Sequence, residues 1–521
     1  MRLPIIYVRG FAGGTPGVDR AVDDPFYGFN EGSVNVRVGG DGRPHFHQFE
    51  SPLLRLILED GYQLFVQGGQ RAYLHSQPDG SVAPATIWVH RFYDVSASTL
   101  GRQPEEFVLE RAAEDLFAFV RLVLDRTGAE RVHLVAHSMG GLICRSMIQR
   151  VIPEHTGRRD GAVDYVQRLF TYGTPHGGIE FAIGFGLVER LRDTFDTNGA
   201  EIFGPDRMYQ YLMPDLPDAP RAAEPPRGWR AEDMPADGFP KDRIFCLVGT
   251  NSEDYGVAMG LSAKAVGARS DGLVQIENAY VPGAHRAFVH RSHSGRYGMV
   301  NSEEGYQNLR RFLFGDLRVD IDLAHLRVRG AADDEIVWQL ETQLAIRGLP
   351  ILMHEQTTAH HCPVQVEWRG TEDSLDTPLP LLTTFLCGTP PRPTRFGAEP
   401  RMGDAEAQVR TIRYALRLRL ISLREEGGAF GFADHLEQTA DFDDTLVVDI
   451  APGDGQAPPR AWATWNSLIP GAIRDWQPLG EPLDDADPVT GRWRGHVRVP
   501  PSSRSILGPD AMVTLAVTTR T

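Results

Sequence analysis

The sequence predicts an α/β fold in its first part and an all-β fold in its last part. Up to about residue 315, short apolar runs alternate with segments of helical periodicity. After about Leu317, short segments of alternating polar and apolar residues follow one another, with Gly, Pro and Asp between them. We therefore expect a mostly parallel sheet covered by helices over residues 1–316 and a β-sandwich-like domain over residues 317–521.

The expected strands of the first part are short and apolar, and they are Leu3–Val8, Thr86–His90, Arg131–Ala136, Arg168–Tyr172, Arg243–Val248 and Ala287–His290. Helices are expected where apolar residues recur every three or four positions, in Glu105–Leu124, Leu142–Val151 and Glu303–Phe314. Ser302 or Asn301 would cap the last helix. A sheet of this kind binds its ligands at the carboxyl ends of its strands.

The clearest strand of the second part is Arg410–Leu420, which alternates strictly. Its apolar positions predict a buried face, and its polar positions predict a solvated face that carries Thr411, Arg413, Arg417 and Arg419. Similar segments are Glu335–Ile346, Pro363–Trp368, Thr445–Ile450, Arg460–Trp465, Trp493–Val499 and Met512–Thr518.

Composition narrows the function classes. The 521 residues carry a net charge of −16, so a broad basic surface for nucleic acid is not expected. The four cysteines include no close pair, and Cys144 and Cys246 are expected as small core thiols. The sequence shows neither a signal peptide nor a long apolar run, which predicts a cytoplasmic protein without an integral membrane segment. Export by a route that needs no signal stays open.

One motif points to nucleophilic catalysis. The segment Ala136-His137-Ser138-Met139-Gly140-Gly141 lies between an expected strand and an expected helix. Small residues two positions on either side of a Ser leave room for a sharp, strained turn, which projects the Ser oxygen above the sheet. The helix amino terminus favours negative charge that develops there. The pattern predicts a nucleophile elbow with Ser138 as the nucleophile.

At this motif the sequence resembles the lipase and esterase branch of the α/β hydrolases. Some bacterial lipases of that branch also have alanine at the first small position, which is Ala136 here. The resemblance covers residues 1–315 and implies the α/β-hydrolase fold. Pro4–Gly14 resembles the strand and glycine-rich loop of lipases, which implies that the backbone N–H groups of Phe11 and Met139 form the oxyanion hole. Arg9 departs from the pattern, since the family usually has His there.

Other loops extend the resemblance. Gly173–Gly178 resembles the G-x-P-H-x-G loop of lipases, and we interpret its His176 as architectural. The string Asp271-Gly272-Leu273-Val274 is similar to the lipase acid loop, which implies Asp271 as the triad acid, with Asp254 as the alternative.

The base must follow the last strand. His293, followed by Ser294-Gly295, resembles the lipase base, and His290 is the alternative. His285 also lies in this region, and His137 is interpreted as structural.

Residues 178–242 form an insertion where lipases of this group carry a lid. Phe181, Phe185 and Val188 recur at helical spacing, so the insertion could offer an apolar face to an acyl chain. A cap helix that never moves is the alternative. The resemblance thus implies a serine carboxylic-ester hydrolase that acts on a hydrophobic acyl ester without a cofactor.

Two other functions stay open. The same triad would serve an acyltransferase or an amide or thioester hydrolase. Alternatively, the chain is a binding or delivery protein whose β domain is the functional part, for which a protein partner is conceivable. His45 and His47, near Asp41, could form a metal pair, although a polar loop is the simpler interpretation, as it is for His360-His361-Cys362. No phosphate-binding motif suggests a nucleotide cofactor.

Overall fold

The computed structural model describes residues 2–10, 29–38, 42–65, 69–92, 107–179, 201–253, 267–328, 336–366, 377–388, 411–424, 440–453, 459–478, 480–485 and 492–520. The chain divides into two compact units. The first takes in most residues up to Leu309, and the second takes in most residues from Arg310 onward. The predicted boundary between residues 316 and 317 stays a prediction, because three residues of the last strand of the first sheet group with the second unit.

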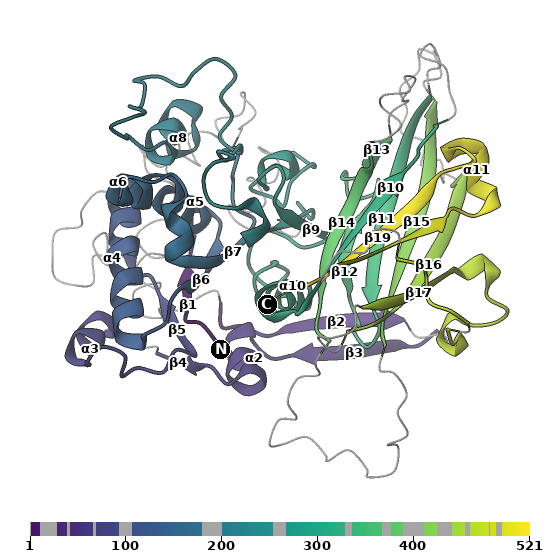
Figure 1. Ribbon diagram of the computed structural model, residues 1–521, viewed down its shortest axis with the longest axis horizontal. Helices are drawn as coiled ribbons and strands as arrows, with labels where there is room; N and C mark the ends of the chain where they lie inside the picture. The colour runs from purple at the N-terminus through teal and green to yellow at the C-terminus, as the bar shows by residue number, and fades with distance from the viewer. Residues whose placement is uncertain are drawn as a thin grey trace, which may run out of the picture. The chain divides into compact units, whose positions relative to one another are not determined.

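The first unit is built on a seven-stranded sheet in the order β4-β5-β1-β6-β7-β8-β9 (Figure 1). The strands are β1 (Ile5–Val8), β4 (Gln63–Leu64), β5 (Thr86–Val89), β6 (Val132–His137), β7 (Val166–Tyr172), β8 (Ile244–Gly249) and β9 (His285–Val289). β1 pairs in parallel with both β5 and β6, and β7 pairs in parallel with β6 and β8. The first strand of the chain therefore lies in the middle of the sheet, and the predicted mostly parallel sheet is confirmed.

The helices of this unit are α2 (Pro52–Asp60), α3 (Gln70–Ser76), α4 (Leu109–Thr127), α5 (Met139–Ser146), α6 (Ile152–Thr156), α8 (Pro205–Leu212) and α10 (Glu303–Phe314). A π-helical turn, Met147–Val151, joins α5 to α6. α4 buries Leu116, Phe119, Val120 and Val123, the spacing that predicted it, and ends at Gly128 with φ 64°. The bounds of α10 are those expected from the sequence.

A separate hairpin, β2 (Ser33–Val38) with β3 (Pro44–Phe49), was not expected from the sequence. His45 and His47 lie in β3 rather than in a polar loop, while Asp41 lies outside the described residues. Within the described ranges, no group of three or more His, Cys, Asp or Glu residues could hold a metal ion.

The second unit is all antiparallel β structure, as predicted. One sheet has the order β14-β10-β19-β18 and the other β12-β11-β15-β16-β17, with β13 also paired to β11. The strands are β10 (Leu317–Ala324), β11 (Ile336–Ile346), β12 (Leu352–Gln356), β13 (Val364–Val366), β14 (Leu379–Leu386), β15 (Ile412–Arg424), β16 (Phe442–Ala451), β17 (Arg460–Trp465), β18 (Arg492–Arg498) and β19 (Met512–Thr519). A short helix, α11 (Pro501–Leu507), precedes β19. One apolar core draws on both sheets, for example Val319 and Leu515 from the first and Leu416 and Val448 from the second.

One residue of β15 corrects the expected solvated face. Arg413 is buried, and its guanidinium binds the buried carboxylate of Asp449 in β16 at 2.8 Å. It also donates to the carbonyl oxygens of Ile473 and Trp476 and lies 5.1 Å from the Trp476 ring. The alternation placed Arg413 opposite the apolar face, but it could not show that Ile473 and Trp476 cover this end of the strand and bury the side chain.

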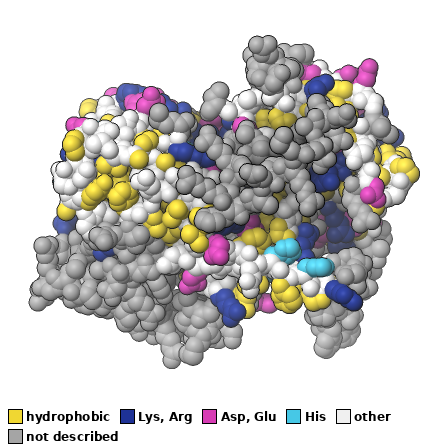
Figure 2. Space-filling model, turned by 90° about the horizontal axis from the view of Figure 1, so that it is seen from below, with side chains coloured by type: hydrophobic (Ala, Val, Ile, Leu, Met, Phe, Trp, Pro, Cys, Tyr) yellow, Lys and Arg dark blue, Asp and Glu magenta, His cyan; other side chains and the backbone are white. Residues whose placement is uncertain are grey.

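On the face drawn in Figure 2, hydrophobic side chains lie scattered among acidic and basic ones, the usual pattern of a protein surface. Among the described helices, none is both long and apolar enough to cross a membrane.

Candidate active site

Ser138 occupies a sharp turn between β6 and α5. Its backbone has φ 54° and ψ −130°, a region that a residue with a side chain rarely adopts. Among the described residues, only two other non-glycine residues have a positive φ, His325 and His361. This is the strand, strained turn and helix that the motif predicted.

Hydrogen bonds hold the strained backbone of Ser138 in place. Its N–H donates to the carbonyl oxygen of Tyr172 at 2.9 Å. Its own carbonyl oxygen accepts from the hydroxyl of Thr174 at 2.9 Å and from the N–H of Gly141 at 3.0 Å. The end of β7 and the loop after it therefore fix the turn.

Two glycines of the motif are required by close contacts. A Cβ at Gly140 would lie 2.2 Å from the carbonyl oxygen of Val8 in β1, and a Cβ at Gly141 would lie 2.1 Å from the hydroxyl of Thr174. Both distances are far below van der Waals contact. The start of α5 can approach β1 and the loop after β7 only because these positions lack side chains.

Asp271 and His293 form a buried pair. The His293 Nδ1 lies 2.8 Å from Oδ2 of Asp271, and both side chains are almost completely buried. Because a carboxylate oxygen accepts, Nδ1 is the donor in this contact, and Nε2 is the ring nitrogen on the side away from Asp271. Oδ1 of Asp271 accepts from the backbone N–H groups of Leu273 and Val274 at 3.0 and 2.8 Å. Asp271 is thus a fixed acceptor that orients His293.

Glycines at the ends of two neighbouring strands make room for this pair. Gly173, with φ 49°, follows β7, and a Cβ there would lie 2.8 Å from Oδ2 of Asp271 and 3.0 Å from Nδ1 of His293. A Cβ at Gly249, the last residue of β8, would lie 2.8 Å from the Asp271 Cβ. Sequence reasoning missed this role, although a Gly at the end of a buried strand was the available signal.

His137 lies directly beside His293. Its Nε2 is 3.0 Å from the backbone carbonyl oxygen of His293, and the two ring centroids are 4.8 Å apart. Burial, with a smaller contribution from the charge of His293, lowers the pKa of His137 to about 3. The residue before Ser138 therefore contacts the predicted base as a neutral side chain.

Of the two predicted oxyanion donors, the structure describes Met139 but not Phe11. Met139 begins α5, so the helix itself leaves its backbone N–H unsatisfied. Val8 pairs with Ala136, which brings the end of β1 beside the elbow, and a Cβ at Gly10 would lie 2.6 Å from the Ser138 Cβ. Phe11, the next residue, lies outside the described residues.

The alternative acid and base are Asp254 and His290. Asp254 lies outside the described residues. The side chain of His290 is exposed, and its Nδ1 lies 3.4 Å from the hydroxyl of Thr250. Of the predicted acids and bases, the described structure brings together Asp271 and His293.

His176 has the buried surroundings of an architectural residue. Its Nε2 lies 3.2 Å from the Thr171 hydroxyl and 3.6 Å from the Cys246 sulfur. Burial lowers the pKa of His176 well below its ordinary value and raises the pKa of the Cys144 and Cys246 thiols. Both thiols are buried and unbridged, as expected.

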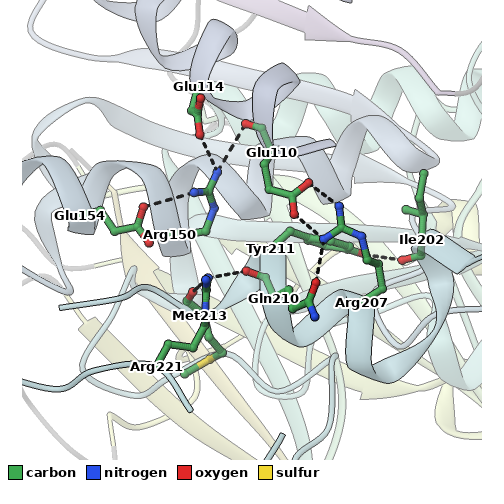
Figure 3. A network of polar contacts seen from close by, with 10 residues as sticks. All are labelled: Glu110, Glu114, Arg150, Glu154, Ile202, Arg207, Gln210, Tyr211, Met213 and Arg221. Atoms are coloured by element: carbon green, nitrogen blue, oxygen red, sulfur yellow. Dashed lines mark hydrogen bonds and ion pairs between the residues drawn. The ribbon is translucent and has the colours of Figure 1, made fainter. Parts of the chain in front are cut away.

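The described part of the insertion is tied to α4, where the guanidinium of Arg207 in α8 binds both carboxylate oxygens of Glu110 (Figure 3). Within the insertion, the hydroxyl of Tyr211 donates to the carbonyl oxygen of Ile202 at 2.9 Å. The predicted lid residues Phe181, Phe185 and Val188 lie outside the described residues.

A second attachment is deeper. Arg145 of α5 is fully buried, and it donates to the carbonyl oxygens of His176 at 3.1 Å and Ala231 at 2.8 Å. Burial lowers the pKa of Arg145 to about 10, so it is still a cation at neutral pH. The helix that begins at the elbow thus holds both the loop after β7 and the insertion.

The sequence similarity to known proteins covers a short part of the chain. No family model matches it. Over 69 residues, 13% of the chain, it is 42% identical to a triacylglycerol lipase of Pseudarthrobacter phenanthrenivorans, and equally to one of Burkholderia plantarii. These stretches span 18% and 16% of the two lipases, so the chain covers less than a fifth of the curated relatives it matches.

Solved structures add low-scoring similarities. A Bacillus licheniformis lipase in mature form has a TM-score of 0.31 at 15% identity, covering 60% of this chain and 91% of the lipase. A Bacillus subtilis carboxylesterase has a TM-score of 0.22 at 12% identity, covering 59% of this chain and 82% of the esterase. TM-scores this low do not support a fold assignment. The fold of the first unit is therefore inferred from its strand order and from the strand, turn and helix at Ser138. The first unit has the α/β-hydrolase fold and resembles bacterial lipases and esterases.

Proposed function

We propose that this protein is a serine hydrolase of carboxylic esters, with Ser138 as nucleophile, His293 as general base and Asp271 as the residue that orients the base. The observation that carries the proposal is the buried 2.8 Å contact between His293 and Asp271, beside the residue that precedes Ser138. A nucleophile, an orienting acid and a base, in this chain order, are the parts that such chemistry needs.

In the proposed reaction, the Ser138 oxygen attacks the ester carbonyl while His293 Nε2 takes the Ser138 proton. The backbone N–H groups of Met139 and Phe11 stabilise the oxyanion, and one such donor is typically worth about 3 kcal/mol of barrier. His293 then gives the proton to the alcohol oxygen as the ester C–O bond breaks. The alcohol leaves, and the acyl group stays on Ser138 as an acyl-enzyme. Water, deprotonated by His293, releases the carboxylic acid and restores Ser138.

We propose that the ester substrate carries a hydrophobic acyl group. The support is the similarity to triacylglycerol lipases over 69 residues and the apolar character of the insertion sequence. Chain length and alcohol group are not fixed by these features. A panel of p-nitrophenyl esters of graded acyl length would define the preference.

A fluorophosphonate probe tests the proposal most directly. We expect the probe to label wild-type protein at one serine and to leave Ser138→Ala unlabelled, with ester hydrolysis lost in parallel. Ser146→Ala is a matched control, since Ser146 is also buried in α5 but lies at its far end. An unlabelled wild type, or a Ser138→Ala variant with normal turnover, would reject the serine-hydrolase mechanism and favour a binding function.

A further inference from the structure

The neutral histidine before the proposed nucleophile has a structural connection to the proposed base. His137 ends β6, and its half-buried side chain contacts the loop that carries His293. Its partner atom is a backbone carbonyl oxygen, which can only accept, so Nε2 of His137 must be the donor at 3.0 Å. The tautomer of His137 is therefore fixed, with Nδ1 unprotonated in the neutral ring.

This hydrogen bond adds a third restraint on His293. Asp271 already binds His293 twice, through its carboxylate to Nδ1 at 2.8 Å and through its carbonyl oxygen to the backbone N–H at 2.8 Å. Both of those contacts place His293 relative to the acid. The contact from His137 places His293 relative to Ser138, because His137 is covalently joined to Ser138.

The surroundings of His137 restrict its ring. A Cβ at Gly10 would lie 3.3 Å from Nδ1 and 3.1 Å from the backbone oxygen of His137, so the chain just after β1 approaches His137 closely. The Phe29 ring lies edge-on, with centroids 6.4 Å apart and planes at 86°. The imidazole is thus enclosed between the end of β1, Phe29 and His293.

We infer that His137 is a positioning residue for catalysis, which sets the distance between the proposed nucleophile and base by donating from Nε2 to the His293 carbonyl oxygen. The inference rests on the proposed function. A small displacement of a general base from its proton donor lowers turnover strongly, by about a hundredfold for about 1 Å. The neutral state of His137 also matters, because a cation there would oppose the protonated form that His293 adopts during the reaction.

The decisive variants are His137→Phe and His137→Gln. Phe fills a similar volume but has no donor, whereas the Gln amide nitrogen stands the same number of bonds from Cβ as Nε2. We expect His137→Phe to lower kcat about tenfold to a hundredfold with KM within about threefold of wild type. We expect His137→Gln to restore kcat to within about threefold of wild type.

A matched control separates positioning from stability. His90, which follows β5, is buried, has a pKa that burial likewise lowers to about 3, and donates from Nε2 to the Ala112 carbonyl oxygen at 3.0 Å. His90→Phe removes the same kind of bond within the same unit. We expect His90→Phe and His137→Phe to lower the melting temperature alike, while only His137→Phe lowers kcat.

The outcomes distinguish this inference from the proposed function. If the fluorophosphonate probe labels wild type, and His137→Phe keeps normal kcat or loses no more than His90→Phe, the positioning role is wrong and the serine mechanism stands. Failure of folded His137→Gln to recover kcat would also contradict the donor role. If wild type itself is not labelled, the proposed function fails first.

Discussion

Single residues carry the candidate chemistry. Ser138 is held in a strained conformation by a hydrogen bond to the Tyr172 carbonyl oxygen and one from the Thr174 hydroxyl, and His293 is held by Asp271. Backbone strain of this kind persists only where the surroundings impose it, and it gathers at functional sites. The sequence alone proposes Ser138 through the small residues that flank it, whereas it proposes Asp271 and His293 through their resemblance to lipase loops.

The acid is the first residue-level prediction. Asp271→Asn keeps the shape of the side chain but removes the charge that stabilises protonated His293, so we expect kcat on a p-nitrophenyl ester to fall by roughly four orders of magnitude. Asp254→Asn is the control and should keep near-normal turnover. The reverse result, with Asp254→Asn inactive and Asp271→Asn active, would reassign the acid.

Contacts between residues distant in sequence were not predictable at this scale. His137 was interpreted as structural because a side chain next to the nucleophile is expected to point away from the site, yet its ring lies 4.8 Å from that of His293. Arg413 was expected in solvent, and it is buried against Asp449. In both cases the partner is far along the chain, so local periodicity holds no information about it.

At the scale of elements, the strands and helices of the first unit were largely predictable. Continuous apolar runs mark strands that are covered on both faces, and β1, β6 and β8 are buried along almost their whole length. The β2–β3 hairpin was missed because Val34, Val36 and Phe46 are exposed there. Alternation then gives no core face from which a strand could be recognised.

The contact between α5 and β1 makes an element-level prediction. A Cβ at Gly140 would meet backbone atoms of β1, which cannot rotate away, so we expect Gly140→Ala to destabilise the fold by about 1–3 kcal/mol and to disturb the elbow. Gly238→Ala is the control, since its nearest contact would be 3.4 Å. Urea unfolding and ester turnover would measure both variants. Equal behaviour of the two would show that the start of α5 can shift freely.

At the scale of the whole molecule, two architectures follow one another in the chain. Near Leu317 the sequence changes from apolar runs and helical periodicity to alternating polar and apolar residues, and β10 starts at this residue. Both sheets of the second unit share one apolar core. The strand order could not be predicted, because pairing such as β1 with β6 depends on crossover connections rather than on local pattern.

Buried histidines predict how stability depends on pH. Burial lowers the pKa of His90 and His137 from the ordinary 6.5 to about 3. The unfolded chain therefore binds protons that the folded chain does not, and stability falls as pH drops from about 6.5 toward 3. The slope should approach about 1.4 kcal/mol per pH unit for each such histidine.

Urea unfolding at a series of pH values between 6.5 and 4.5 would measure this slope. His90→Phe should be less stable at pH 7 and should lose stability less steeply on acidification, because one of the histidines with a lowered pKa is gone. A free energy of unfolding that stays constant over this range in wild type would contradict the assignment of neutral buried side chains.

The central place of β1 has a consequence for synthesis. Its two neighbours come from residues 86–89 and 132–137, so Ile5 emerges from the ribosome long before the strand that completes its pairing. At roughly 5–20 residues per second, the delay is on the order of 10 s. The proposed base, His293, emerges later still. A nascent chain that already displays Ser138 would therefore have no catalytic power until the last strand and its loop are translated, and ribosome-bound intermediates should not react with a fluorophosphonate.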